Sequence, residues 1–344
     1  MNERVSGLIN RLILENGSDL HLAADNPPMI RIHGKLVPMD GQPILSSDDT
    51  LEIIAQIIQE NEIHELEKTG ELDAAIEVEG GYRIRINAYR QQNTYAAALR
   101  LLPNQFFEFK ELGLPINVLE HICKLHAGLV LVTGATSSGK STTIASIINR
   151  INQERYCHIH TIEDPVEYRH RSLRSFVTQR EIGRDTVTFV EALRRSMRED
   201  PDVIVIGEMR DLETMSAALT LAETGHLTFA TLHTSTAIQT VSRIVSAFPA
   251  AQQPQIRIQL ASTLQYAICQ KLIPWDNGKG RSLVAEILYV NSAVRAMIRE
   301  EKTHQINNVM QTNYDKGMRT LEQSLDDVIK KGYISNKTAQ LYKE

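Results

Sequence analysis

The chain has 344 residues, of which 42% are hydrophobic and 23% are charged, and its formal net charge is −5. This length predicts two domains, each large enough to bury a core, and the acidic balance lacks the basic footprint of a nucleic-acid-binding protein. No apolar run approaches the ~20 residues that a membrane span needs, and the first residues do not resemble a secretory signal. The three scattered cysteines fit neither a disulfide framework nor a CxxC zinc site. We therefore expect a cytoplasmic protein.

The first hundred residues carry the pattern of a small mixed α/β domain. Apolar periodicity predicts helices over 4–14 and 51–58, the second one capped by Ser46-Ser-Asp-Asp. Strands are predicted from Asp19 onward, over 29–37, and over 94–102. A hairpin is predicted over 72–78 and 82–89, with its turn at Gly80-Gly81. Most of these strands should pair antiparallel.

Three arginines of this domain have two possible interpretations. Arg83 and Arg85 are two residues apart on a predicted strand, so they share one face, and Arg100 lies on the next strand. Exposed strand faces are commonly charged, which is the structural interpretation. The functional interpretation is an arginine finger that reaches the γ-phosphate of a neighbouring subunit.

The region after a predicted linker at 103–114 alternates strands and helices. Strands are predicted over 129–132, 158–161, 203–206 and 227–231. Helices are predicted over 116–125, 144–151, 188–199, 212–224 and 237–247. Such alternation predicts a parallel sheet with helices on both faces. From residue 252 onward the pattern predicts mostly helix, including 292–300 and 321–331, with one strand over 283–290.

A phosphate-binding loop lies between the first strand and the first long helix of this region. The segment Gly134-Ala-Thr-Ser-Ser-Gly-Lys-Ser141 matches the P-loop pattern in its strand–loop–helix context. Backbone N–H groups and the helix N-terminus should cradle phosphates, Lys140 should reach the β- and γ-phosphates, and Ser141 should hold Mg²⁺. We therefore predict binding of ATP and Mg²⁺. The predicted nucleotide-binding residues are Gly134, Ala135, Thr136, Ser137, Ser138, Gly139, Lys140, Ser141 and Thr142.

Two acidic segments follow predicted strands of the same region. Glu208 comes directly after the apolar run at 203–206, and Glu163 lies in the segment Thr161-Ile-Glu-Asp-Pro-Val-Glu167. The carboxyl ends of parallel strands meet at one edge of the sheet, where ligands bind in open α/β sheets. An acid there can contact Mg²⁺ or polarise the attacking water. Asp164 and Glu167 are also compatible with a solvated turn.

Two histidines flank the predicted strand at 227–231. We expect His226 and His233 at the same edge of the sheet as the nucleotide, where they could sense the γ-phosphate or contact the next subunit. A purely structural role is the alternative. A zinc site is disfavoured because no third ligand is suitably spaced.

Four motifs in this order resemble those of the secretion-ATPase superfamily. Residues 134–141, 161–167, 200–211 and 223–234 are similar to its Walker A, Asp box, Walker B and His box. Within the superfamily the chain most resembles the type IV pilus retraction ATPases. Ser18-Asp-Leu-His-Leu, Pro27-Pro-Met-Ile-Arg and the segment 293–306 contribute to that similarity.

The resemblance implies a fold, an oligomeric state and a cellular function. It implies a PAS-like N-terminal domain at 1–102 and a RecA-like ATPase domain with a helical C-terminal extension at 115–344, which form a homohexamer. Nucleotide would lie between the two domains of one subunit, near the N-terminal arginines. Hydrolysis would power pilus retraction and twitching motility through pilin disassembly. The ring would bind a platform protein at the cytoplasmic face of the inner membrane, with no transmembrane segment of its own.

The same resemblance implies roles for individual residues. Glu208 would activate the water, Glu163 would support metal and water, and His226 and His233 would be the His-box residues. Arg83, Arg85 and Arg100 would be the finger candidates, and Ser141, Glu163 and Glu208 would hold Mg²⁺, partly through water. Four alternatives stay open: an assembly or secretion ATPase, an accessory retraction paralogue, a nucleic-acid translocase, and a nucleotide-gated ring without catalysis.

The chain departs from the family pattern at two places. Ala135 and Ser137 stand where the family loop usually has proline and glycine, so a non-glycine residue is expected to carry backbone strain at 137. Ala296 and Met297 replace asparagine and leucine in the C-terminal motif that the family ties to retraction.

Overall fold

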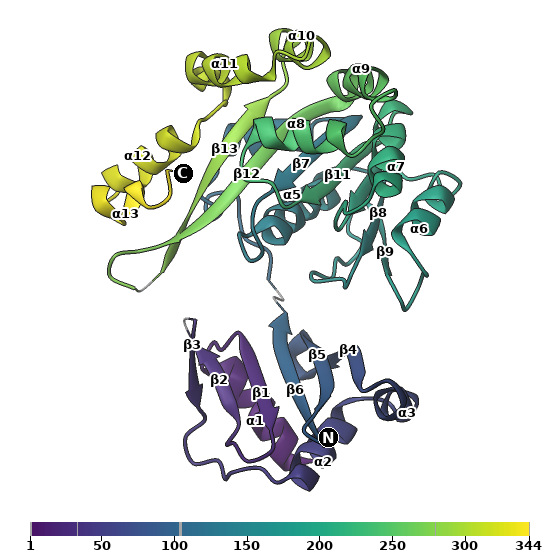
Figure 1. Cartoon of the computed structure of the whole chain (residues 1–344), viewed down its shortest axis with the longest axis vertical. Helices are drawn as coiled ribbons and strands as arrows, with labels where there is room; N and C mark the ends of the chain where they lie inside the picture. Colours follow the sequence, from purple (N-terminus) through teal and green to yellow (C-terminus); the bar gives the residue numbers. More distant parts are fainter. Residues whose placement is uncertain (1, 33, 103–104, 279, 344) are drawn as a thin grey trace. The chain divides into compact units, whose positions relative to one another are not determined.

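The computed structural model describes residues 2–32, 34–102, 105–278 and 280–343, and the chain forms two compact units (Figure 1). The first unit is Met1–Gln105 and the second is Phe106–Glu344. Residues 103–104 of the predicted linker lie outside the described residues, whereas Leu112 and Leu114 are buried in the core of the second unit. Among the described residues, none of the helices combines the length and apolar character that crossing a bilayer requires.

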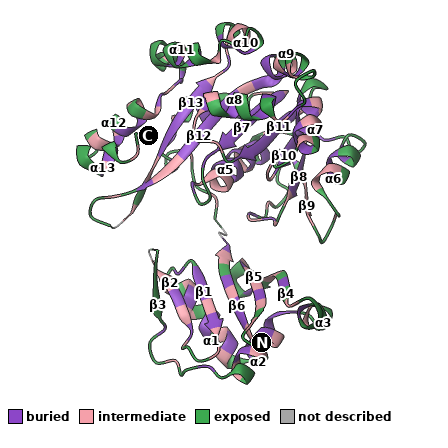
Figure 2. Ribbon diagram, viewed as in Figure 1, coloured by how far each residue is buried: buried purple, intermediate pink, exposed green. Residues whose placement is uncertain are grey.

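The first unit is an antiparallel sheet with helices packed on one face (Figure 2). Its strand order is β3-β2-β1-β6-β5-β4. The strands are β1 (Asp19–Ala23), β2 (Met29–Ile32), β3 (Lys35–Pro38), β4 (Glu71–Val78), β5 (Tyr82–Gln91) and β6 (Thr94–Leu102). The helices are α1 (Glu3–Leu14), α2 (Ser47–Ile57) and α3 (Glu60–Thr69). Alternate residues of β5, such as Ile84 and Ile86, enter a core shared with the helices. The predicted mixed α/β domain is confirmed.

The prediction of one strand over 29–37 is wrong, because that stretch is a hairpin. Strands β2 and β3 pair antiparallel with Ile32 opposite Lys35, and Gly34 has φ 83°. The left-handed backbone at this turn favours glycine. Apolar alternation continues through the turn in the sequence, so the pattern alone did not reveal it. Helix α3 was not predicted, since Leu66 is its only buried residue and its apolar stripe is correspondingly weak.

The second unit contains a seven-stranded sheet in the order β13-β12-β7-β11-β10-β8-β9. All neighbouring strands are parallel except β12 and β13. The strands are β7 (Gly128–Thr133), β8 (His158–Glu163), β9 (Phe176–Glu181), β10 (Val203–Ile206), β11 (Leu227–Leu232), β12 (Leu264–Pro274) and β13 (Arg281–Tyr289). Every residue of the central strands β7, β10 and β11 is buried, as expected for strands covered on both faces.

Helices cover both faces of this sheet (Figure 1), which confirms the predicted layered fold. One face packs against α4 (Ile116–Cys123) and α5 (Lys140–Glu154), and Val130 and Val132 of β7 point into that core. The other face packs against α6 (Phe189–Ser196), α7 (Leu212–Glu223), α8 (Ala237–Ser246) and α9 (Gln253–Thr263). Helices α10 (Ser292–Arg299), α11 (Ile306–Thr312), α12 (Leu321–Lys330) and α13 (Asn336–Gln340) follow β13.

Two strands of this unit differ from the prediction. The stretch after residue 252 is not largely helical, because β12 runs over Leu264–Pro274 beside β7. It is an interior strand that includes the buried polar residue Gln270, so it shows neither alternation nor a purely apolar run. Strand β9 was not predicted either, because its position at the sheet edge leaves a half-exposed, polar sequence.

Candidate functional site

The P-loop connects β7 to α5 and depends on glycine at two points. Gly134 has φ 140° and Gly139 has φ 92°. A Cβ at Gly134 would lie 2.3 Å from the backbone oxygen of Gln270, so no side chain fits there. Ser137 has φ 63°, which confirms that a non-glycine residue takes the left-handed conformation where the family usually has glycine. The shape of the loop therefore depends on left-handed backbone at 134, 137 and 139 and on the lack of a side chain at Gly134.

Lys140 is the first residue of α5 and is held by the loop itself. Its Nζ donates hydrogen bonds to the carbonyl oxygens of Gly134, at 2.8 Å, and Ala135, at 2.9 Å. Burial lowers the pKa of Lys140, and the carboxylates of Glu208 and Glu167 oppose that shift. The N-cap of α5 is Gly139, which has no side chain to satisfy the first amides of the helix. Those amides can therefore bind an anion, and the site fits the phosphates of a nucleotide.

Glu208 follows β10, and its carboxylate contacts the side chains of an arginine and a histidine. Its Oε2 lies 2.9 Å from a guanidinium nitrogen of Arg210, and its Oε1 lies 3.1 Å from Nε2 of His233. Strands β10 and β11 are parallel neighbours, so the residues that follow them meet at one edge. The structure therefore brings Glu208 and His233 together. Arg210 was missed as a site residue, although its place two residues after Glu208 was the available signal.

Glu163 ends β8 and is half-buried among polar side chains. Thr161 Oγ1 donates to its Oε1 at 2.6 Å, and Gln179 Nε2 donates to the same oxygen at 3.3 Å. Burial raises the pKa of Glu163 to about 7, and the hydrogen bonds from Thr161 and Gln179 oppose that rise. Gln179 lies on β9 and was not recognised in the sequence.

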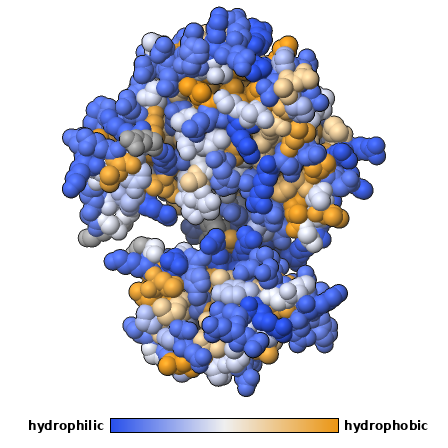
Figure 3. All heavy atoms as spheres, in the orientation of Figure 1, coloured by the Kyte–Doolittle hydropathy of each residue, from blue (hydrophilic) through white to orange (hydrophobic). Residues whose placement is uncertain are grey.

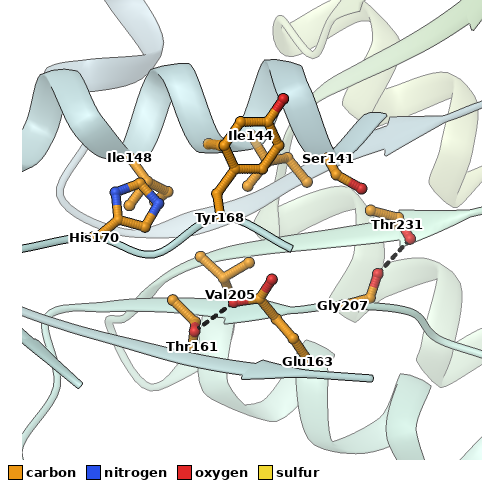
Figure 4. A pocket seen from close by; sticks show the side chains of 11 residues that line it. Ser141, Ile144, Ile148, Thr161, Glu163, Tyr168, His170, Val205, Gly207 and Thr231 are labelled. Carbon is orange, nitrogen blue, oxygen red and sulfur yellow. Dashed lines mark hydrogen bonds between the residues drawn. The ribbon is translucent and has the colours of Figure 1, made fainter. Parts of the chain in front are cut away.

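A small cavity of about 40 Å³ joins the P-loop helix to Glu163 (Figure 4). Ser141, Thr161, Glu163 and Thr231 line it, as do Ile144 and Val205. It is large enough for a few water molecules. Among the described residues there is no cluster of three or more His, Cys, Asp or Glu side chains that could hold a metal by itself. Mg²⁺ at a nucleotide needs only one or two protein ligands, because phosphates and water supply the rest, so Ser141 and Glu163 fit this metal.

The expectation that His226 shares the nucleotide edge is wrong. His226 precedes β11, and its backbone oxygen accepts from the N–H of Gly128 at the start of the parallel strand β7. The P-loop follows the other end of β7, so the six residues of β11 separate His226 from that edge by about 20 Å. The His226 ring instead bonds Thr224 Oγ1 at 3.1 Å and the Leu221 carbonyl at 3.0 Å, at the end of α7.

The three predicted arginines share one face of the first unit's sheet, opposite the helices. Arg85 lies directly across from Arg100, which lies across from Asp19. Arg100 Nε lies 2.8 Å from Asp19 Oδ1, and Arg85 lies 3.3 Å from Asp73. Arg83 is 8% exposed. The arginines are thus grouped as expected, and two of them are partly neutralised by aspartates.

An aromatic stack near the cavity was not predicted. The ring of Phe106 stacks on His170 at a centroid distance of 4.7 Å and on Tyr168 at 5.7 Å. Tyr168 donates to Thr142 Oγ1 of α5 at 2.9 Å. Burial lowers the pKa of His170 to about 4. Tyr168 and His170 line the cavity, and no sequence motif marked the stack because Phe106 is far along the chain from its two partners.

The motifs and geometry match known proteins over almost the whole chain. The family model for type II/IV secretion system proteins matches residues 3–276. The type IV pilus retraction ATPase PilT of Pseudomonas aeruginosa is 43% identical over 326 residues, covering 95% of this chain and 94% of that protein. The type IV pilus ATPase PilU of the same organism is 36% identical over 332 residues, covering 96% of this chain and 86% of that protein.

A solved structure is similar to this chain both in fold and in sequence. The crystal structure of the pilus retraction motor PilT with bound ADP superposes with a TM-score of 0.90 at 46% identity. The match covers 98% of this chain and 96% of that chain. Nucleotide binding and the two-domain fold therefore follow from comparison as well as from the residues.

Proposed function

The chain belongs to the type II/IV secretion system protein family and is an ATPase, and we propose that it works as a homohexameric motor that retracts type IV pili. The observation that carries the proposal is the site at the carboxyl edge of the seven-stranded sheet, where the P-loop, Glu163, Glu208 and His233 come together. The similarity to a pilus retraction ATPase over 95% of the chain supports the choice of cargo.

Different residues of this chain have different roles in hydrolysis. The P-loop amides and Lys140 bind the phosphates, and Ser141 with Glu163 would hold Mg²⁺, which neutralises charge on the phosphates. Glu208 orients the attacking water and takes up its proton as a general base. Arg210 and His233 fix the position of the Glu208 carboxylate through their contacts at 2.9 Å and 3.1 Å.

The arginine face of the first unit supplies the candidates for a finger. Arg83, Arg85 and Arg100 lie on neighbouring strands and face the same side. We expect the triple alanine variant to lose most ATPase activity, because a finger stabilises charge on the transferred phosphoryl group. If the finger acts between subunits, mixing this variant with Lys140→Ala subunits restores part of the activity. Arg11→Ala, on helix α1, is the control.

The cellular test is deletion of the gene with scoring of pili and twitching. A retraction motor predicts excess surface pili and no twitching, restored by the wild-type gene and not by Lys140→Ala. Bald cells would identify an assembly ATPase instead. Normal pili and twitching, lost only when a second family member is also removed, would identify an accessory paralogue. We propose that the ring acts at the cytoplasmic face of the inner membrane, bound to a platform protein.

A further inference from the structure

Strand β9 lies at the edge of the large sheet and faces the loop that follows Glu163. Within β9, Gln179 lies opposite Thr161 and Glu181 lies opposite Glu163. Both β9 residues contact the loop at 164–170: Glu181 Oε2 accepts from the N–H of Val166 at 3.0 Å, and Gln179 Oε1 accepts from the N–H of His170. An edge strand whose side chains hold the loop after a catalytic acid can control the position of that acid.

The Gln179 side chain bonds on both of its polar atoms. Its Nε2 donates to Glu163 Oε1 at 3.3 Å and to the Tyr168 carbonyl at 2.9 Å. Its Oε1 accepts from the backbone N–H of His170 at 2.7 Å. A single amide therefore joins the acid to the loop that carries Tyr168 and His170, two residues that line the cavity beside Ser141.

Glu163 receives two donors on one oxygen, from neighbouring strands. Thr161 Oγ1 lies 2.6 Å from Oε1, and Gln179 Nε2 approaches the same atom. Two donors on one carboxylate oxygen fix the plane of the group, and partners of this kind orient the ligands of metal sites. We propose that Gln179 is a positioning residue that aims Glu163 and acts on ATP hydrolysis through it. This inference rests on the proposed role of Glu163.

If Gln179 only anchors the loop at 164–170 and does not act through Glu163, its variants should behave differently. Gln179→Glu keeps an oxygen that accepts from His170 but loses the N–H groups that reach Glu163 and Tyr168, whereas Gln179→Leu loses every hydrogen bond of the amide. If Gln179 only anchors the loop, a double variant with Glu163→Gln should show the product of the two single effects. If Gln179 acts through Glu163, the double variant should resemble Glu163→Gln alone.

The experiment measures steady-state hydrolysis of Mg-ATP and binding of a fluorescent ATP analogue by the full chain. We expect Gln179→Leu and Gln179→Glu to lower kcat about 10- to 100-fold, with KM and analogue affinity within about threefold of wild type. Glu163→Gln/Gln179→Leu should lie within about threefold of Glu163→Gln. The matched control is Gln253→Leu, which removes a bond to the Phe248 carbonyl far along the chain and should leave kcat within about twofold.

Failure of the inference and failure of its premise give different results. Wild-type kcat in Glu163→Gln would remove the proposed role of Glu163 and the inference with it. A low kcat in Glu163→Gln with wild-type kcat in Gln179→Glu would overturn the inference alone. Independent, multiplicative losses in the double variant would do the same. If Gln179→Leu does not fold, the glutamate variant with its own double variant decides the question.

Discussion

The two edges of the seven-stranded sheet use similar residue types for different purposes. At the amino edge, the His226 ring bonds Thr224 and Leu221, and the backbone N–H of His158 donates to Asp202 Oδ2 at 2.7 Å. These contacts close turns between neighbouring elements. At the carboxyl edge, Lys140 and the free amides of α5 form a site that fits the phosphates of a nucleotide, and Glu163 and Glu208 end or follow the neighbouring strands. The edge on which a polar residue lies therefore decides its function more than its type does.

The largest expected effect comes from removing the P-loop cation. Lys140→Ala deletes the only positive side chain within the loop segment 134–141, so the affinity for ATP should fall at least about tenfold and hydrolysis should be lost. Titration with a fluorescent ATP analogue measures the affinity. Lys124→Ala, an exposed lysine at the end of α4, is the control and should bind as wild type. Equal affinity in both variants would contradict the assignment.

Substitution of His233 and of His226 compares the carboxyl edge of the sheet with its amino edge directly. His233→Ala removes the partner of Glu208 Oε1 and should lower kcat roughly tenfold, as loss of an orienting partner does. His226→Ala should leave ATP affinity unchanged and cost only about 1 kcal/mol of stability, because it loses a helix-end hydrogen bond. Kinetics, ATP titration and thermal unfolding measure the three quantities. A weaker ATP affinity in His226→Ala than in His233→Ala would reverse the comparison.

The stack beside the cavity should make stability depend on pH. The pKa of His170 is about 4 in the folded protein and near 6.5 when unfolded, so the unfolded state binds more protons between these values. Stability is therefore lost as the pH falls, by about 2 kcal/mol between pH 7 and 5 from this group. Relative to wild type, His170→Phe should therefore raise the melting temperature at pH 5 more than at pH 7, while His304→Phe, at an exposed histidine, should not. The same difference from wild type at both pH values would refute the linkage.

The smallest effect concerns the strained serine of the P-loop. Ser137 has φ 63°, and relief of a left-handed non-glycine residue is worth about 1 kcal/mol, partly offset by the added freedom of glycine when unfolded. Ser137→Gly should therefore be slightly more stable than Ser137→Ala, which keeps the strain. Thermal unfolding of the two variants compares them, and the opposite order would show that the strain is relieved in another way.

Local patterns allowed part of this structure to be predicted, and distant pairing decided the rest. The P-loop is a contiguous motif, and Glu208 and His233 each follow an apolar strand, so both could be found from the sequence. Strands β9 and β12 take their places through pairing with β8 and β7, which leaves little local signal. Gln179 and Phe106 contact residues of other segments of the chain, which a local pattern does not reveal. The error at His226 arose because the two ends of one strand lie at opposite edges of the sheet.

The most direct test of the central claim is phosphate release by the purified full chain and by Glu208→Gln, with ATP binding measured in both. The wild-type protein should release phosphate over many turnovers, while Glu208→Gln should bind ATP normally and lose about 10²- to 10⁴-fold in kcat. Glu213→Gln, at an exposed acid in the first turn of α7, is the control and should hydrolyse ATP as wild type. Wild-type turnover in Glu208→Gln would contradict the assignment of the catalytic base at the carboxyl edge.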